Sequence, residues 1–236
     1  MINKTFVKLI EENYFKFSKF SKRQKLTFLK ELEMILANYF EVPNCDIFIK
    51  SLSPKTTSFG NIPPACFRCS PNDLSVNPQI FFDEQKLNEY SFSKIIKLLF
   101  HEWMHYLSHH HLHISPCKNI PEKYLAFINM ADNVKRLHIE NLENERLGRA
   151  LQKLSPNEYV ADLFARDILK FLAESSSPHD LKLQAQEKIE REENMQEKHL
   201  RSINKICGTN YSTSREIEFE KILKTRRKKE CLNNIN

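Results

Sequence analysis

The stretch FSKIIKLLFHEWMHYLSHHHL, residues 92–112, carries the features from which the rest of the chain can be interpreted. It has helical periodicity, because its apolar residues recur on one stripe: Phe92, Ile95, Ile96, Leu99 and Trp103. We therefore predict one amphipathic helix over residues 92–112. On this helix His101 and His105 are four residues apart, so both imidazoles lie on the same face, one turn from each other.

The pattern His-Glu-x-x-His at residues 101–105 is typical of zinc hydrolases. His101 and His105 can bind one tetrahedral Zn²⁺ ion together. Glu102 is adjacent to the first ligand, and its carboxylate can reach the open position of the metal and accept a proton from bound water. Zinc lowers the pKa of such a water to about 7. We therefore predict Zn²⁺ as the cofactor and Glu102 as the general base.

A second motif, NEYVADLFA at residues 157–165, contains the candidate third ligand. Glu158 and Asp162 share a helix face with two alanines, whose small side chains would allow close approach to the first helix. We predict that Glu158 binds the metal and that Asp162 orients a ligand histidine through its other ring nitrogen. A simpler interpretation stays open: Ser155 and Glu158 also have the spacing of a capping box.

His111 is a competing third ligand, because its distance from His101 and His105 matches the metzincin spacing. Metzincins have Gly where this chain has Ser108, and that Gly permits the turn that returns the third histidine to the metal. With Ser108 we expect the helix to continue. The histidines after it would then form an exposed cluster or secondary metal ligands: His109, His110, His111 and His113.

The composition indicates a helical fold with a small sheet. Gly occurs only 3 times and Phe 17 times, which disfavours turn-rich all-β folds. Short apolar runs at residues 47–49 and 80–82, bounded by Pro, Asn and Ser, predict strands. We therefore expect a helix-dominated α+β fold with a small β-sheet, an active-site helix and additional N- and C-terminal helices.

The predicted organisation is one domain, residues 1–174, and a charged helical C-terminal extension, residues 179–236. The sequence Ser-Ser-Ser-Pro at residues 175–178 is a linker signal, and charged residues dominate after it. Within the domain we predict N-terminal helices over 1–40, the small sheet over 45–83, the motif helix over 92–112, a further helix within 120–148 and the third-ligand helix over 155–174.

The charge pattern disfavours nucleic acid as a partner. The net charge is +6, but 30 acidic residues are interspersed with 36 basic ones. A basic run at residues 224–229 could contact phosphates, yet such runs are common at solvated helix ends. No stretch approaches the roughly 18 apolar residues of a membrane span, and no signal-peptide core follows the N-terminus. We therefore expect a soluble, cytoplasmic protein with no membrane partner.

Six cysteines are scattered along the chain, which predicts reduced thiols rather than a disulfide framework. Cys66 and Cys69 have the C-x-x-C spacing of half a zinc site or of a redox pair. No second C-x-x-C follows, so this pair alone predicts no metal site.

The two motifs resemble the gluzincin core of ImmA/IrrE-type metallopeptidases, which pair H-E-x-x-H with a later E-x-x-A-[ND]-x-F-A helix. The resemblance covers roughly residues 78–172. It implies that the α+β fold is a minimal zincin core and that residues 1–174 are a zincin-like metallopeptidase domain. It also implies that His101, His105 and Glu158 ligate zinc, that Glu102 is the catalytic base, and that the substrate is a specific intracellular protein. The 52 residues between His105 and Glu158 are more than the compact family pattern has, and they would hold an inserted helix.

We therefore expect a zinc metallopeptidase that hydrolyses a peptide bond in a protein or peptide substrate. Two alternatives stay open: a zinc hydrolase of a non-protein substrate, and a non-catalytic zinc-containing regulatory or binding protein. Glu102 disfavours the latter, because a closed structural site has no use for a base. Tyr106, His109 or Tyr159 could donate to the oxyanion, and the strand at residues 79–83, if it is an edge, could hold an extended substrate.

Overall fold

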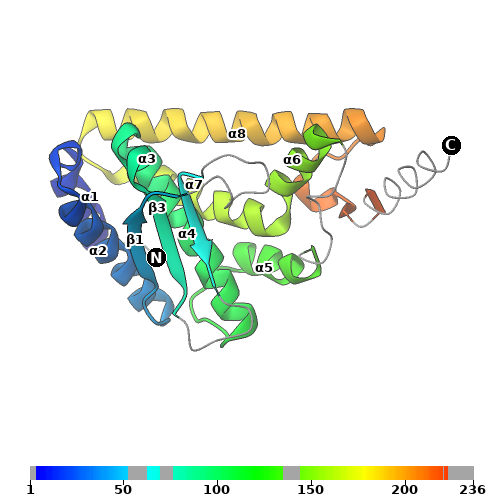
Figure 1. Cartoon of the computed structure of the whole chain (residues 1–236). Coiled ribbons are helices and arrows are strands. Elements are labelled where there is room, and N and C mark those ends of the chain that lie inside the picture. Colours follow the sequence, from blue (N-terminus) through cyan, green and yellow to red (C-terminus); the bar gives the residue numbers. More distant parts are fainter. Residues whose placement is uncertain (1–3, 53–62, 70–76, 135–143, 220, 223–236) are drawn as a thin grey trace. The chain divides into compact units, whose positions relative to one another are not determined.

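The computed structural model describes residues 4–52, 63–69, 77–134, 144–219 and 221–222. Helices predominate in it and three strands form one small sheet, which confirms the predicted helix-dominated α+β class. The helices and strands are α1 (Lys4–Tyr14), α2 (Lys22–Phe40), β1 (Asp46–Lys50), β2 (Ala65–Arg68), β3 (Gln79–Asp83), α3 (Glu84–Glu89), α4 (Phe92–His113), α5 (Glu122–Val134), α6 (Glu145–Leu154), α7 (Pro156–Ser175) and α8 (His179–Cys207) (Figure 1).

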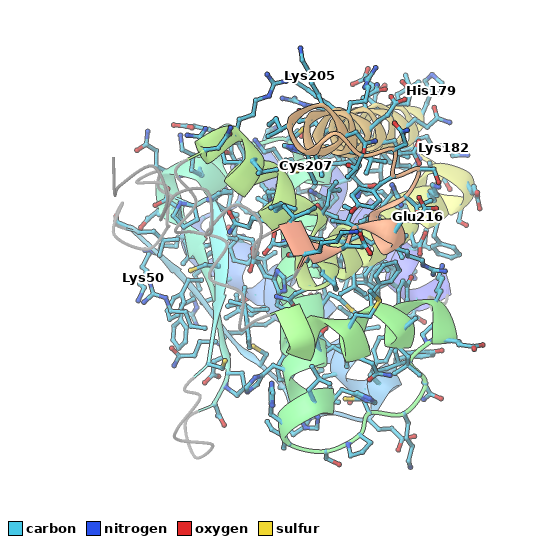
Figure 2. The ribbon with its side chains drawn as sticks, turned by 90° about the vertical axis from the view of Figure 1, so that its right-hand side faces the viewer. Lys50, His179, Lys182, Lys205, Cys207 and Glu216 are labelled. Atoms are coloured by element: carbon cyan, nitrogen blue, oxygen red, sulfur yellow. The ribbon has the colours of Figure 1, made fainter. Side chains whose placement is uncertain are left out.

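The contacts along the chain divide it into two compact units. The first contains residues 1–121 and 161–189, and the second contains residues 122–160 and 190–236. Both α7 and α8 contribute residues to each unit. The ends of α8, His179 and Cys207, are labelled in Figure 2.

The sheet of the first unit has the strand order β1-β3-β2. β3 pairs in parallel with β1 and antiparallel with β2, so β3 is the central strand. The expectation that the strand at residues 79–83 could be an edge is therefore wrong. β2 is an edge strand, and it lies against α4.

Side chains alternate between the two faces of this sheet, and one of these faces is buried. Ile47 and Ile49 of β1 are buried, whereas Phe48 between them is exposed. In the helical layer of the same unit, the ring of Trp103 lies 5.3 Å from that of Phe40 and 6.1 Å from that of Phe164. These aromatic contacts join α2, α4 and α7, so the motif helix is fixed on several sides.

A buried carboxylate also attaches α4 to the start of the sheet. Glu33 of α2 accepts hydrogen bonds from the Cys45 backbone N–H at 2.8 Å and from the Trp103 indole N–H at 3.3 Å. Burial raises the pKa of Glu33 above its usual range. This side chain links α2, β1 and α4 through two otherwise unsatisfied donors.

The start of α8 packs on α7 within the first unit. Leu169 of α7 forms an apolar cluster with Ala185 and Ile189, which are four residues apart on α8. This spacing places both on one helix face. The linker signal at residues 175–178 therefore lies between two helices of the same unit, α7 and the first part of α8.

The second unit has its own core, built from α6, the C-terminal part of α8 and the chain after α8. Asn144 begins α6 by accepting a hydrogen bond from the Leu147 N–H at 3.0 Å, which is a typical N-cap. The cluster contains Leu147, Ala150, Leu151, Leu154, Ile203, Ile217, Phe219 and Ile222. The helix predicted within residues 120–148 corresponds to α5 and the start of α6, and the basic run at 224–229 lies outside the described residues.

None of the helices described here combines the length and the apolar character that a membrane span requires.

Candidate metal centre

The two motif histidines face each other on α4. The Nε2 atoms of His101 and His105 are 3.2 Å apart, and both side chains are on the same face of the helix. Two nitrogens bound to one tetrahedral zinc, each at about 2.0–2.1 Å, would be separated by about 3.3 Å. The donor pair therefore has the separation that a shared zinc ion needs, with little side-chain rearrangement.

Asp162 of α7 holds the first of these histidines. Its Oδ1 lies 2.8 Å from Nδ1 of His101, and only 6% of the residue is exposed. Because the carboxylate accepts the Nδ1 proton, the lone pair of His101 is on Nε2, the atom that faces His105. The predicted role of Asp162 as the residue that orients a ligand histidine matches this geometry.

Lys97 completes this buried arrangement. Its Nζ lies 2.9 Å from the same Oδ1 of Asp162, and the two side chains are only 12% and 7% exposed. The ammonium group compensates the charge of the carboxylate where water cannot. Sequence reasoning did not assign Lys97 a role, although its position four residues before His101 placed it on the same helix face.

Glu158 lies in the first turn of α7, one turn before Asp162, and it joins the two histidines in one group. One ligand atom each from His101, His105 and Glu158 lies within 4.8 Å of the other two. Among the described residues, this is the only group of three potential metal ligands that meets this distance. Two imidazoles and a carboxylate are a donor set that suits zinc, with a fourth position open.

The contacts of Ser155 and Glu158 do not favour the interpretation of Glu158 as part of a capping box. The Ser155 hydroxyl donates to the carbonyl oxygen of Gln152 at 2.7 Å, while the Glu158 carboxylate lies 3.2 Å from the Nζ of Lys153. Lys153 is half exposed, so it can move away when a cation replaces it. The side chain of Glu158 is thus available to both the lysine and the histidine pair.

Glu102 is positioned by the edge strand. Its Oε2 accepts a hydrogen bond of 2.7 Å from the backbone N–H of Phe67 in β2, and only 8% of the residue is exposed. This bond fixes the Glu102 carboxylate at β2, on the residue that directly follows His101 in α4. Sequence reasoning identified Glu102 but had no signal for the Phe67 N–H, because a backbone donor is independent of the side-chain pattern.

The His111 side chain contacts the segment after α4. α4 continues through His113, so the turn that metzincins need after the second histidine is absent from this described helix. The Nδ1 of His111 accepts a hydrogen bond of 3.0 Å from the backbone N–H of Cys117. The geometry therefore favours Glu158 over His111 beside the pair.

The three side chains considered as oxyanion donors have different surroundings. The buried Tyr106 hydroxyl donates to the carbonyl oxygen of Pro43, and burial raises the pKa of this tyrosine. The Tyr159 ring packs on Phe127, with centroids 4.8 Å apart, in the core of the second unit. His109 lies beside the thiol of Cys69. Tyr106 is thus engaged in packing, and no contact selects one of the other two.

The group of His101, His105 and Glu158 could hold a divalent cation, and Glu102 directly follows one of these residues in the chain. A zinc ion in a His₂Glu set with one open position can activate water, and a neighbouring carboxylate can accept the proton. Comparison with known proteins adds no further assignment: no protein-family model, no curated protein and no solved structure matches this chain.

Proposed function

We propose that this chain is a zinc-dependent metallopeptidase that hydrolyses a peptide bond in a protein substrate. The observation that carries the proposal is the position of Glu102. Its carboxylate is held at 2.7 Å by the Phe67 N–H, and Glu102 directly follows in the chain His101, a member of the histidine pair whose nitrogens are 3.2 Å apart. A purely structural zinc site would have no need for such a carboxylate.

The proposed roles follow from these contacts. His101, His105 and Glu158 hold the zinc, and Asp162 keeps His101 in the tautomer that can bind it. Zinc would supply Lewis acidity, which makes a coordinated water acidic and polarises the substrate carbonyl. Glu102 accepts the proton of the attacking water and returns a proton to the leaving amine. The Phe67 N–H holds the Glu102 carboxylate in one orientation.

The edge strand favours a peptide substrate over a non-protein one. In an antiparallel pair, alternate residues direct their backbone groups to the outer edge. Phe67 does so, because its N–H reaches Glu102 rather than β3. An extended peptide that pairs with this edge of β2 would therefore lie next to the proposed base. This support does not extend to a substrate without a peptide backbone.

The proposal also includes the protein family and the cellular location. The H-E-x-x-H and E-x-x-A-D-x-F-A motifs resemble those of ImmA/IrrE-type metallopeptidases, and on this basis we infer a specific intracellular protein substrate and a cytoplasmic enzyme. The two helices α5 and α6 occupy the segment between the motifs, where one inserted helix was expected.

Metal analysis and peptide hydrolysis test the proposal together. Zinc content is measured by mass spectrometry for wild type, Glu158→Gln, His111→Ala and Glu102→Gln, and each protein is then incubated with a diverse peptide library. We expect about one zinc at this centre, lost only in Glu158→Gln. We also expect cleavage by wild type that falls by about 10²–10⁴-fold in Glu102→Gln. Equal cleavage by wild type and zinc-loaded Glu102→Gln would overturn the proposal.

A further inference from the structure

A surface cavity of about 330 Å³ lies within the first unit. It is formed by the end of α1, the starts of α2, α4 and α8, and the end of α3. None of the residues around it belongs to the group of His101, His105 and Glu158. Small-molecule sites have volumes of about 300–1,000 Å³, so the cavity is large enough for a small organic ligand.

Aromatic side chains form much of the wall of this cavity. The ring of Phe92 lies edge to face with two others, 5.3 Å from the centroid of Phe17 and 5.5 Å from that of Tyr14. Phe15 also lines the cavity, and it is 67% exposed, the greatest exposed fraction among the large apolar side chains of the described residues. A ligand ring in the cavity would therefore cover apolar surface that is otherwise in contact with water.

A buried ammonium group lines the same cavity. Lys25 of α2 is only 5% exposed, and its Nζ donates to Oδ1 of Asn88 at 2.6 Å and lies 5.4 Å from the centre of the Phe17 ring. An ammonium has three donors, yet within the described part of the chain Asn88 is its only hydrogen-bond partner and no carboxylate forms an ion pair with it. Burial lowers the pKa of Lys25. An anionic ligand would supply the counter-charge.

The other charges around the cavity limit the kind of anion. Ser91 is the N-cap of α4 and makes no side-chain capping bond, so the positive end of this 22-residue helix adds to the attraction of Lys25. Asp180 of α8 also lines the cavity, and its carboxylate is exposed. A dianion such as a phosphate ester would be repelled by Asp180, whereas a monocarboxylate brings a single charge that Lys25 can neutralise.

We propose that this cavity binds an aromatic monocarboxylate, with its carboxylate on Lys25 and its ring against Tyr14, Phe17 and Phe92. The observation that carries the proposal is a buried ammonium in a wall of aromatic rings. Both halves of such a ligand have a partner, because Lys25 donates charge-assisted hydrogen bonds to the carboxylate and the aromatic wall packs against the ring. The site does not depend on the metallopeptidase proposal, since it shares no residue with the metal centre.

Isothermal titration calorimetry of the full chain with phenylacetate tests the site. We expect saturable binding with a Kd of about 1 mM or less, as the size of this probe allows. Phenylethanol has the same ring and no charge, and it should bind at least about 10-fold more weakly, because a charge-assisted hydrogen bond is lost. Tighter binding of phenyl phosphate than of phenylacetate would overturn the assignment of a monocarboxylate.

Lys25→Met removes the ammonium and keeps an apolar side chain of similar length. It should weaken phenylacetate binding by at least about 10-fold and leave phenylethanol binding unchanged. Lys22→Met is the matched control, because Lys22 lies one turn earlier in α2, pairs with Glu84 and does not line the cavity. Binding should not change in that variant. Equal phenylacetate binding by wild type and Lys25→Met would overturn the proposal.

Two further variants keep the test decisive. Phe15→Ala should weaken the binding of phenylacetate and phenylethanol alike, by about 2–10-fold, and an exposed side chain can be truncated without unfolding the chain. Glu158→Gln is needed because a carboxylate can also bind zinc. Phenylacetate binding that disappears in Glu158→Gln would belong to the metal centre and would overturn the cavity site. Binding that persists there and falls in Lys25→Met supports the site, whether or not the metal centre is catalytic.

Discussion

The two histidine pairs of α4 have the same spacing but different surroundings. The first pair is accompanied by buried carboxylates: Asp162 bonds to His101, and Glu102, the next residue in the chain, is held by the Phe67 N–H. In the second pair, His109 and His113, His109 lies beside the Cys69 thiol and His113 is exposed. The sequence pattern cannot distinguish the pairs, since spacing on a helix is all that it encodes. What differs is which other elements reach each turn of α4.

This difference predicts different metal-binding properties. A histidine whose second nitrogen is bonded to a carboxylate is held in one tautomer and orientation, which is worth about 10–100-fold in metal affinity. The first pair has this support, and Lys97 balances the charge that the support introduces. Mutations of the supporting residues should therefore affect the first pair and leave the second unchanged.

The largest effect is expected for Asp162→Ala. This change removes a carboxylate that bonds to His101 and that pairs with Lys97, whose side chain is 12% exposed. We expect the protein to lose about 3–5 kcal/mol of unfolding free energy, as when one member of a buried pair is deleted. Zinc affinity at the first pair should fall by about 10–100-fold. Urea denaturation and competition with a chromogenic chelator measure the two quantities.

Asp162→Asn is the matched control, because the amide keeps an oxygen that can accept the His101 proton. It should retain more zinc affinity than Asp162→Ala. If Asp162→Ala bound zinc as tightly as wild type, the contrast between the two pairs would not depend on the buried carboxylate.

A smaller loss of stability is expected for Glu33→Ala, which tests how the first pair is anchored. Oε1 of Glu33 accepts hydrogen bonds from Cys45 and from Trp103, the residue midway between the two motif histidines. Removing the acceptor leaves two donors unsatisfied in the core. At about 1–3 kcal/mol for a buried unsatisfied group, we expect a loss of about 2–4 kcal/mol in urea denaturation.

Glu33→Gln provides the comparison, because its amide oxygen can accept both bonds and carries no buried charge. Its stability at neutral pH should stay within about 1 kcal/mol of wild type. A loss in Glu33→Gln equal to that in Glu33→Ala would mean that the charge of Glu33, and not its acceptor oxygen, supports α4.

The smallest effect is expected for Lys153→Ala. Lys153 lies 3.2 Å from the Glu158 carboxylate and competes with a metal ion for it, but its side chain is 46% exposed. Exposed ion pairs contribute up to about 1 kcal/mol, so zinc affinity should rise by no more than about fivefold. Isothermal titration calorimetry with Zn²⁺ measures the change. Lys118→Ala removes an exposed pair with Glu41 and should change nothing. Weaker zinc binding in Lys153→Ala would mean that the lysine positions Glu158 rather than competing for it.

Much of the local structure followed from the sequence alone. Helical periodicity predicted a helix over residues 92–112, and α4 spans Phe92–His113. The Ser-Pro signal predicted a helix from residue 155, and α7 begins at Pro156. Both predictions depend on interactions between residues three or four apart, which the sequence contains directly. The composition likewise predicted the helix-dominated class, because scarce Gly and abundant apolar residues favour helices.

Contacts between distant segments could not be obtained in this way. The spacing of Glu158 suited both a capping box and a metal ligand, and only the packing of α7 brought it within 4.8 Å of the histidines. The strand at residues 79–83 had the pattern of any buried strand, and only pairing on both sides made it central. Patterns in a sequence report which face of an element is apolar, but not which element covers that face.

The candidate site likewise combines residues that the sequence identified with contacts that only tertiary packing determined. His101, Glu102 and His105 could be identified from one turn of helix, because ligand spacing on a helix is a local property. The hydrogen bond from Phe67 to Glu102 and the approach of Cys69 to His109 depend on how β2 lies against α4. Those contacts join residues 35 and 40 positions apart, and tertiary packing alone determines which backbone and side-chain atoms meet over such separations.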